Sequence, residues 1–296
     1  MKYRIVPVLV FFLLSGASLS AQILPIFLSD KDKNPDPQSY SFRGRIPNKE
    51  FIEHSDTFRE SKDIPEGVKD SFLKSAVGVK VSVLDSSTGI YSGYNGMGFV
   101  TQSDGREAEV VTNFHVIADK VCDAEQKNCR YELKNWRSVA IFTEKNMLLL
   151  ATLVYYDELA DLALLKIKIP EGRVFDKRPM SLSDDPAPKK DEVYFSTFVS
   201  FSQSIPETPN EISIIELPSI QAYEAHGYTM NIRVKYLGVM DGWTRLGFSG
   251  GCIVDRSGVC HGIVEAECET RVETLYIPSP VVLAFLHGYE ESLTIY

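Results

Sequence analysis

The sequence lacks an apolar run long enough to form a membrane-spanning helix, which needs about 20 consecutive apolar residues. Two shorter apolar stretches stand out, at residues 5–14 and residues 147–156, and Thr152 interrupts the second. The first lies at the N-terminus, where a short apolar run is typical of a removable export signal. We therefore expect a mature protein with no integral membrane segment.

Residues 1–21 have the three parts of a secretory signal. Lys2 and Arg4 supply the positive charge, residues 5–14 the apolar part, and small residues from Ser15 to Ala21 the cleavage region. No cysteine lies near this cleavage region, so the lipid-anchored form of export is not expected. The prediction is an exported protein, periplasmic or secreted.

An excess of basic residues is also missing. The chain has 31 Lys and Arg against 40 Asp and Glu, which gives a formal charge of −9. Removal of residues 1–21 takes away Lys2 and Arg4 and leaves a charge of −11. Because an acidic protein repels phosphate groups, nucleic acid and anionic membrane surfaces are poor candidate partners. The hydrophobic share of 44% is typical of a folded domain.

The cysteines lack the short spacings of zinc-binding pairs; they are Cys122, Cys129, Cys252, Cys260 and Cys268. Cys122 and Cys129 flank a polar loop, and because export makes disulfides possible, we expect a small bridge between them. The other three cannot all pair, and a bridge between Cys252 and Cys260 depends on a hairpin register that the sequence does not fix. A zinc site is the weaker alternative, since His261 is the only imidazole nearby. No metal or cofactor is predicted.

From residue 71 onward, short apolar runs alternate with turn residues, a pattern typical of antiparallel β-structure. A polar bridge at residues 184–190 divides these runs into two sets. We therefore predict a first β-barrel over 71–180 and a second over 181–296, which ends in a helix that begins near Pro280. Residues 22–70 are charged and rich in proline, which predicts a polar N-terminal arm or a regulatory prosegment.

Three motifs carry candidate chemistry. Ser249 lies in the motif GFSGG, whose glycines permit the sharp turn that exposes a nucleophilic hydroxyl. The backbone N–H groups of Gly247 and Ser249 are spaced to converge on one oxyanion. His115 lies in TNFHVI and Asp161 heads the apolar run DLALLKI, so a base and an orienting carboxylate are also present. Asp157 is an alternative carboxylate, but Asp161 directly adjoins the predicted strand.

TNFHVI, DLALLKI and GFSGG, in this order, resemble the trypsin-like serine peptidases, and specifically their bacterial HtrA-like branch. The likeness includes residues 72–83, which resemble the first strand of that branch. It implies an all-β fold of two packed six-stranded antiparallel β-barrels with a C-terminal helix. It also implies that His115 is the general base, Asp161 the orienting carboxylate and Ser249 the nucleophile, with Gly247 and Ser249 as the oxyanion donors.

The sequence departs from the family pattern at three points. Phe248 stands where digestive relatives carry an aspartate that pairs with a newly formed N-terminus, so activation through that ion pair is not expected. Cys252 takes a position that is often proline. The sequence after the predicted last helix leaves no room for a PDZ domain, so we expect an HtrA-like member without one.

Together these features predict an exported serine endopeptidase that cleaves protein or peptide substrates through an acyl-enzyme. An alternative of a different class is a secreted binding or adhesion protein that keeps the fold without catalysis, which Phe248 and Cys252 motivate. A third is a zymogen whose residues 22–70 cover the active-site cleft, which is expected to lie between the two predicted barrels. No residue indicates an oligomeric state. The remaining histidines are interpreted as surface or structural residues: His54, His226, His261 and His287.

Overall fold

The computed structural model describes the chain between residues 63 and 294, with gaps. The described residues are 63–84, 91–124, 129–133, 137–145, 147–185, 192–199, 212–218, 223–229, 232–241, 244, 247–268 and 273–294. The predicted signal and most of the predicted arm lie outside them.

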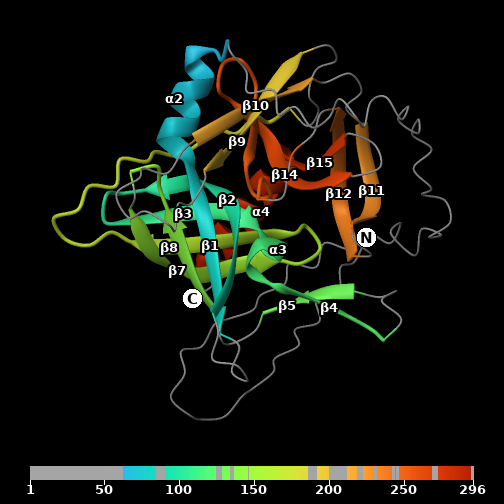
Figure 1. Cartoon of the computed structure of the whole chain (residues 1–296), viewed down its shortest axis with the longest axis horizontal. Coiled ribbons are helices and arrows are strands. Elements are labelled where there is room, and N and C mark those ends of the chain that lie inside the picture. Colours follow the sequence, from blue (N-terminus) through green and yellow to red (C-terminus); the bar gives the residue numbers. More distant parts are fainter. Residues whose placement is uncertain are drawn as a thin grey trace.

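The first half of the described chain forms a closed six-stranded barrel in the order β1-β2-β3-β8-β7-β6 (Figure 1). Its strands are β1 (Ala76–Leu84), β2 (Tyr91–Ser103), β3 (Glu107–Asn113), β6 (Arg137–Phe142), β7 (Leu148–Asp157) and β8 (Leu162–Lys168). Val77, Val79 and Val81 alternate along β1 and are buried in the barrel interior. This period of two is what places one apolar face of each strand in the core. The predicted first barrel is confirmed.

Two short elements follow β3 and are not strands of the barrel. They are the one-turn helix α3 (Phe114–Ile117) and a hairpin of β4 (Asp119–Cys122) with β5 (Cys129–Glu132). Cys122 is disulfide-bonded, and the hairpin register places Cys129 directly opposite it. The hydrophobic pattern does not predict this hairpin, because its strands are short and largely polar.

The second half forms a curled seven-stranded sheet in the order β10-β9-β13-β14-β15-β12-β11. Its strands are β9 (Val193–Val199), β10 (Ile212–Pro218), β11 (Tyr223–Thr229), β12 (Ile232–Asp241), β13 (Cys252–Val254), β14 (Cys260–Cys268) and β15 (Glu273–Pro278). The predicted two-barrel fold is therefore confirmed, but this half has one strand more than the six expected. The additional strand is β11, whose sequence YEAHGYT has few apolar residues and which forms by antiparallel pairing with β12.

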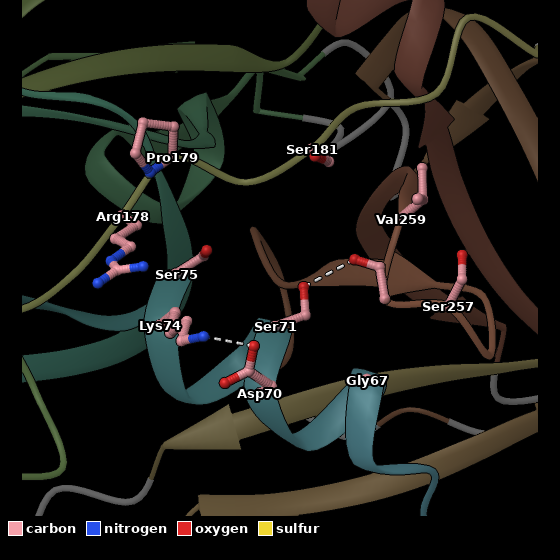
Figure 2. A pocket seen from close by; sticks show the side chains of 11 residues that line it. Gly67, Asp70, Ser71, Lys74, Ser75, Arg178, Pro179, Ser181, Ser257 and Val259 are labelled. Carbon is pink, nitrogen blue, oxygen red and sulfur yellow. Dashed lines mark hydrogen bonds and ion pairs between the residues drawn. The ribbon is translucent and has the colours of Figure 1, made fainter.

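Helix α2 (Glu66–Ser75) precedes the first barrel and contacts the second half of the chain. Val68 and Phe72 on this helix are fully buried, and Ser71 Oγ donates to the carbonyl of Gly258 at 2.7 Å (Figure 2). The expected first strand at residues 72–83 begins only at Ala76, because residues 72–75 complete this helix. Figure 2 shows a polar pocket beside α2, and none of the predicted catalytic residues lines it.

Helix α4 (Ser279–Thr294) confirms the predicted C-terminal helix and packs across to the first barrel. Tyr155 of β7 lies with its ring centroid 5.0 Å from Phe285 and 5.7 Å from Tyr289 of α4. Within the described part of the chain, no helix is both long and apolar enough to cross a membrane.

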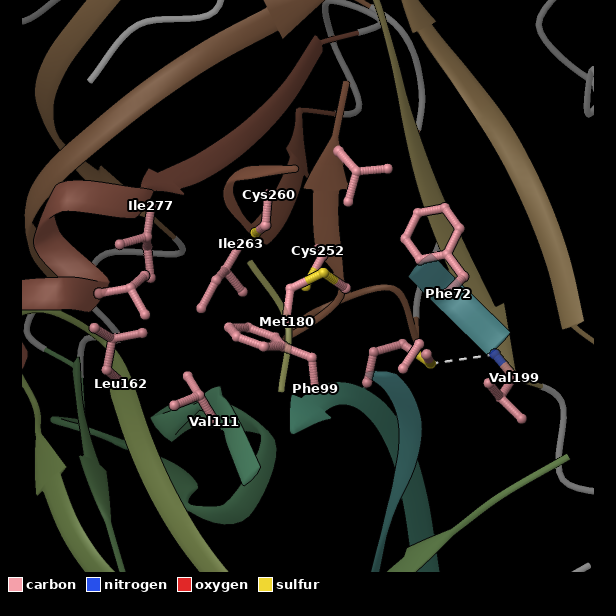
Figure 3. Close-up of a cluster of buried hydrophobic side chains, with 14 of the residues drawn as sticks. Phe72, Phe99, Val111, Leu162, Met180, Val199, Cys252, Cys260, Ile263 and Ile277 are labelled. Atoms are coloured by element: carbon pink, nitrogen blue, oxygen red, sulfur yellow. Dashed lines mark hydrogen bonds between the residues drawn. The ribbon is translucent and has the colours of Figure 1, made fainter. Parts of the chain in front are cut away.

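A single apolar cluster joins the two halves and is separate from the interiors of the barrel and the curled sheet. Met97 Sδ on β2, for example, accepts a hydrogen bond from the backbone N–H of Val199 on β9 at 3.2 Å. Burial of this cluster holds the two halves in a fixed relation, since close-packed side chains resist sliding. Figure 3 labels members from both halves: Phe72, Phe99, Val111, Leu162, Met180, Val199, Cys252, Cys260, Ile263 and Ile277.

Candidate active site

Asp161 has an unusual backbone conformation. Among the described non-glycine residues it alone has a positive φ, at 53°. Its carbonyl accepts hydrogen bonds from the backbone N–H of Phe114 at 3.0 Å and from the side-chain amide of Asn113 at 3.1 Å. Aspartate tolerates this left-handed region better than most residues, and such strain persists only where the surroundings enforce it. These bonds join the start of α3 to the turn before β8.

His115 on α3 contacts the carboxylate of Asp161 through two groups. Its Nδ1 lies 2.6 Å from Oδ2, and its backbone N–H donates to Oδ1 at 2.8 Å. The Asp161 side chain is fully buried, whereas the His115 side chain is 12% exposed. The structure therefore brings the predicted base and its predicted carboxylate together and leaves part of the imidazole accessible.

The electrostatic surroundings favour a protonated His115. Burial alone opposes the charged form, but the charge of Asp161, its hydrogen bond and the charge of Glu265 together raise the pKa of His115 above its ordinary value. Tyr131, from β5, lies with its ring centroid 5.8 Å from that of the imidazole. Burial, followed by the charges of Asp161 and Glu265, raises the pKa of Tyr131, so this phenol stays neutral.

The GFSGG turn is fixed by backbone hydrogen bonds on both sides. Gly250 donates to the carbonyl of Val264 on β14 at 2.9 Å, and the Ser249 carbonyl accepts from the backbone N–H of Met97 on β2 at 2.7 Å. Gly250 has a φ of +87°, and a Cβ there would lie 2.0 Å from the Met97 carbonyl oxygen. Only glycine fits this position, both in conformation and in space. The turn is thus held between the first barrel and β14.

The Ser249 hydroxyl faces β14. Its Oγ donates to the carbonyl of Glu265 at 3.0 Å, and no hydrogen bond joins it to His115, although both residues are described. Gly96 marks how closely α3 and the serine turn approach, since a Cβ there would lie 2.6 Å from Val116 and 3.1 Å from the Ser249 carbonyl. The structure therefore places Ser249 in the same site, with its hydroxyl turned toward Glu265.

The two predicted oxyanion donors lie at the start of this turn. Gly247 has a φ of +100°, and a Cβ there would lie 2.7 Å from the Phe198 ring. Within the described part of the chain, neither the Gly247 N–H nor the Ser249 N–H donates a hydrogen bond to another group. Backbone donors that are not used internally are what an oxyanion site requires.

The sequence matches the family model described as a trypsin-like peptidase domain over residues 96–263, more than half of the chain. The chain belongs to the trypsin-like peptidase family. Two solved structures are similar in fold: the active form of the Rv3671c protease from M. tuberculosis, with TM-score 0.52 and 19% identity over 76% of this chain and 87% of that one, and the inactive form of the Rv3671c protease, with TM-score 0.51 and 18% identity over 77% and 98%. No curated protein sequence matches.

Glu265 lies beside His115 and Asp161 in this candidate site, and the sequence did not predict it. It is fully buried on β14, and its carboxylate, the carboxylate of Asp161 and an imidazole nitrogen of His115 all lie within 4.8 Å of one another. In the described residues this is the only such cluster of His, Cys, Asp or Glu, but Nδ1 of His115 is already engaged with Asp161. The sequence of β14, CHGIVEAEC, contains a second glutamate, Glu267, so no local signal distinguished Glu265 before the fold was known.

Phe248 anchors the GFSGG turn through apolar contact. It is almost completely buried, and its ring stacks on Phe198 with a centroid distance of 5.5 Å. Tyr194, Ile253 and Tyr276 belong to the same cluster. Phe248 is thus integrated into the apolar core of the second half, and the expectation that no N-terminal ion pair forms there stays a prediction.

Cys252 and Cys260 are buried free thiols. The register of β13 and β14 pairs Cys252 with Ile263 and Val254 with Cys260, so the two cysteines are not cross-strand partners. Burial, then a hydrogen bond and interaction with Cys260, raises the pKa of Cys252 well above its ordinary value. Such thiols act as apolar core residues. The side chain of Cys268 lies outside the described residues.

The remaining candidates have structural environments. Asp157, the alternative carboxylate, accepts hydrogen bonds from the backbone N–H groups of residues 159 and 160 and so stabilises a turn. His261 pairs with Asp255 at 3.1 Å, and the exposed His287 lies 3.5 Å from Glu291. His54 and the side chain of His226 lie outside the described residues.

Proposed function

We propose that this protein is an exported serine endopeptidase with His115 as general base, Asp161 as orienting carboxylate and Ser249 as nucleophile. The observation that carries the proposal is the buried contact between His115 and Asp161, 2.6 Å long, beside a glycine turn that presents Ser249. A base held by a buried carboxylate, next to a serine on a strained turn, is the arrangement that acyl transfer requires. The matched peptidase family supports protein or peptide substrates.

The chemistry follows from these groups. Ser249 Oγ must first rotate from the Glu265 carbonyl toward His115. Nε2 of His115 then takes the hydroxyl proton while Oγ bonds to the peptide carbonyl carbon, and the N–H groups of Gly247 and Ser249 bind the oxyanion. The C–N bond breaks as the imidazolium returns its proton to the leaving amine. Water, deprotonated by His115, hydrolyses the acyl-enzyme and regenerates Ser249.

Export is part of the same proposal. It rests on the signal-like composition of residues 1–21. The position of Cys122 opposite Cys129 supports a bridge between them, of the kind that forms in oxidising compartments. Peptide mapping of the exported protein without reduction tests both points, because it reports the mature N-terminus and the cysteine pairing. Membership of the HtrA-like branch remains a prediction from sequence.

One observation favours the alternative, a secreted binding protein that has the fold without catalysis. The Ser249 hydroxyl is bonded to the Glu265 carbonyl at 3.0 Å and not to the base. The structural neighbours do not discriminate, since the active and inactive forms of the Rv3671c protease match almost equally well. A covering segment within residues 22–70 would also keep the serine unreactive.

Labelling with a fluorophosphonate, which reacts with activated serines, tests the proposal. The purified mature protein should label and cleave an unstructured protein substrate, and the Ser249→Ala variant should do neither. Labelling of both proteins would remove Ser249 from the mechanism. Absence of labelling in both proteins, with the fold confirmed, would support either the binding alternative or a zymogen with a covered active site. Labelling is then repeated on protein that lacks residues 22–62: labelling would support the covered active site, and its continued absence the binding alternative.

A further inference from the structure

Glu265 is connected to every member of the proposed triad. Its backbone carbonyl accepts the hydrogen bond from Ser249 Oγ at 3.0 Å. Its carboxylate lies within 4.8 Å of a ligand atom of both His115 and Asp161. It projects from β14, the strand to which the serine turn is bonded through Gly250. One residue therefore links the strand behind the nucleophile to the base.

The position of this carboxylate gives its charge a large effect. Glu265 and Asp161 are both fully buried, so water screens their interaction with the imidazole only weakly. The groups that face His115 come from three elements: Asp161 before β8, Glu265 on β14 and the neutral ring of Tyr131 on β5. Two acidic groups and no basic group of the described chain act on this imidazole. Its charged form is thus favoured from two sides.

We propose that Glu265 is a positioning residue for His115, in which a second buried carboxylate acts with Asp161 to stabilise the imidazolium. This inference rests on the proposed function, because it assigns His115 the role of base. During acyl transfer the imidazole takes the Ser249 proton and becomes charged, and the two carboxylates lower the energy of that state. In the free enzyme the same two charges keep His115 protonated up to a higher pH than Asp161 alone would. His115 can therefore act as a base only above that pH.

Two opposite consequences follow for the rate. At low pH the enzyme is inactive because protonated His115 cannot accept a proton. The midpoint of the acidic limb of the pH–rate profile should therefore lie at a higher pH than the pKa of an isolated histidine. On the alkaline plateau, where His115 is neutral, the second carboxylate speeds the chemical step. Removal of the charge should move the acidic limb to lower pH and also reduce the plateau rate. A residue that only supports the fold would not move the limb.

The Glu265→Gln variant removes the charge and keeps the size of the side chain. The titration of His115 is followed by NMR with ¹³C-labelled histidine in the mature chain that carries Ser249→Ala, and a His115→Ala sample assigns the signal. An opposite charge at this distance changes a proton affinity by about tenfold or more, so the His115 midpoint should fall by about one pH unit. The conservative Glu265→Asp variant should restore part of the shift, because it keeps the charge.

Glu290→Gln is the matched control, since it makes the same chemical change at an exposed position of α4. It should leave the His115 midpoint unchanged. If Glu265→Gln does not fold, Glu265→Ser removes the charge without adding bulk and gives the same measurement. An unchanged midpoint in a folded charge-free variant would overturn the proposal, because Glu265 would then be neutral or too far to act.

The NMR titration needs no catalysis, so the two proposals fail separately. A protein that never labels with fluorophosphonate but shows the shifted His115 midpoint would lose the proposed activity and keep the role of Glu265. In a protein that cleaves substrate, the pH profile of kcat/KM should show the same displacement of the acidic limb, since that quantity reports the free enzyme. Labelling by Ser249 together with an unchanged midpoint would retain the triad and remove Glu265.

Discussion

A methyl group at position 250 should disrupt the GFSGG turn far more than a methyl group at position 105 disrupts its own turn. Gly250 has a φ of +87°, and its Cβ would lie 2.0 Å from the Met97 carbonyl oxygen and 2.5 Å from Thr112 Oγ1. Thr112 is buried and its hydroxyl donates to that same carbonyl at 2.7 Å. Neither atom can move without breaking this bond and shifting β2 against β3.

Gly105 provides the matched control. Its φ is +84°, almost equal to that of Gly250, but a Cβ there would have nothing within 4 Å. Gly105→Ala therefore isolates the backbone strain, which costs about 1–2 kcal/mol in the left-handed region. Gly250→Ala has the same strain, a lost hydrogen bond of about 1 kcal/mol and overpacking of about 1–3 kcal/mol. We expect the free energy of unfolding to fall by about 2–4 kcal/mol more for Gly250→Ala than for Gly105→Ala.

Denaturant unfolding of the two variants and the parent measures this difference, with fluorescence and circular dichroism compared to check that the transition is two-state. Fluorophosphonate labelling of the same samples reports the position of Ser249. Gly105→Ala should label like the parent, whereas Gly250→Ala should label slowly even where it is folded. Equal destabilisation by the two substitutions would refute the steric argument. Normal labelling of Gly250→Ala would show that the turn does not depend on this contact.

Three further predictions concern buried groups. Asp161→Asn should lower the pKa of His115 and reduce kcat by about 10³–10⁴-fold. Because the pKa of His115 is raised in the folded protein, the stability that Asp161 provides should be complete below about pH 6.5 and lost as the pH rises through the folded pKa. Thermal unfolding of parent and variant at several pH values checks this. Phe248→Asp should unfold the second half or lower its thermal midpoint strongly, since it puts a charge into an apolar cluster, while Phe248→Leu should cost only about 1–2 kcal/mol. The Lys177 side chain is fully buried, and its Nζ contacts a carboxylate oxygen of Glu144 at 2.6 Å. Glu144→Ala removes the partner of this buried charge, so the free energy of unfolding in denaturant should fall by about 3–5 kcal/mol. The double variant Lys177→Met with Glu144→Leu should recover most of that loss.

The sequence predicts the architecture well because the fold depends on patterns that repeat locally. The alternation of Val77, Val79 and Val81 and similar runs indicates strands with one buried face, and Pro280 marks the start of α4. Where the local pattern is absent, the prediction fails. The sequence of β11 is mostly polar, and this strand forms through its antiparallel backbone pairing with β12. Helix α2 begins at Glu66, inside the segment expected to be an arm, because the side chains of Val68 and Phe72 are buried in the apolar core of the protein.

The same division applies to the site. Motif chemistry alone singles out His115, Asp161 and Ser249, and the resemblance to trypsin-like peptidases assigns their proposed roles. Glu265 could not be found in this way, because a glutamate in a strand gives no sign of which charged groups will lie beside it. The orientation of the Ser249 hydroxyl likewise depends on a carbonyl sixteen residues away.

The sequence by itself determined the residue types available for catalysis, the two sets of strands and the glycines that a sharp turn needs. Only the tertiary structure decided that Asp161 adopts a positive φ, that Phe248 enters the core and that a second carboxylate reaches His115. The physical reason is one of range. Propensity and hydrophobic period act between near neighbours in the chain, whereas charge interaction and steric fit act through space between strands that the sequence separates.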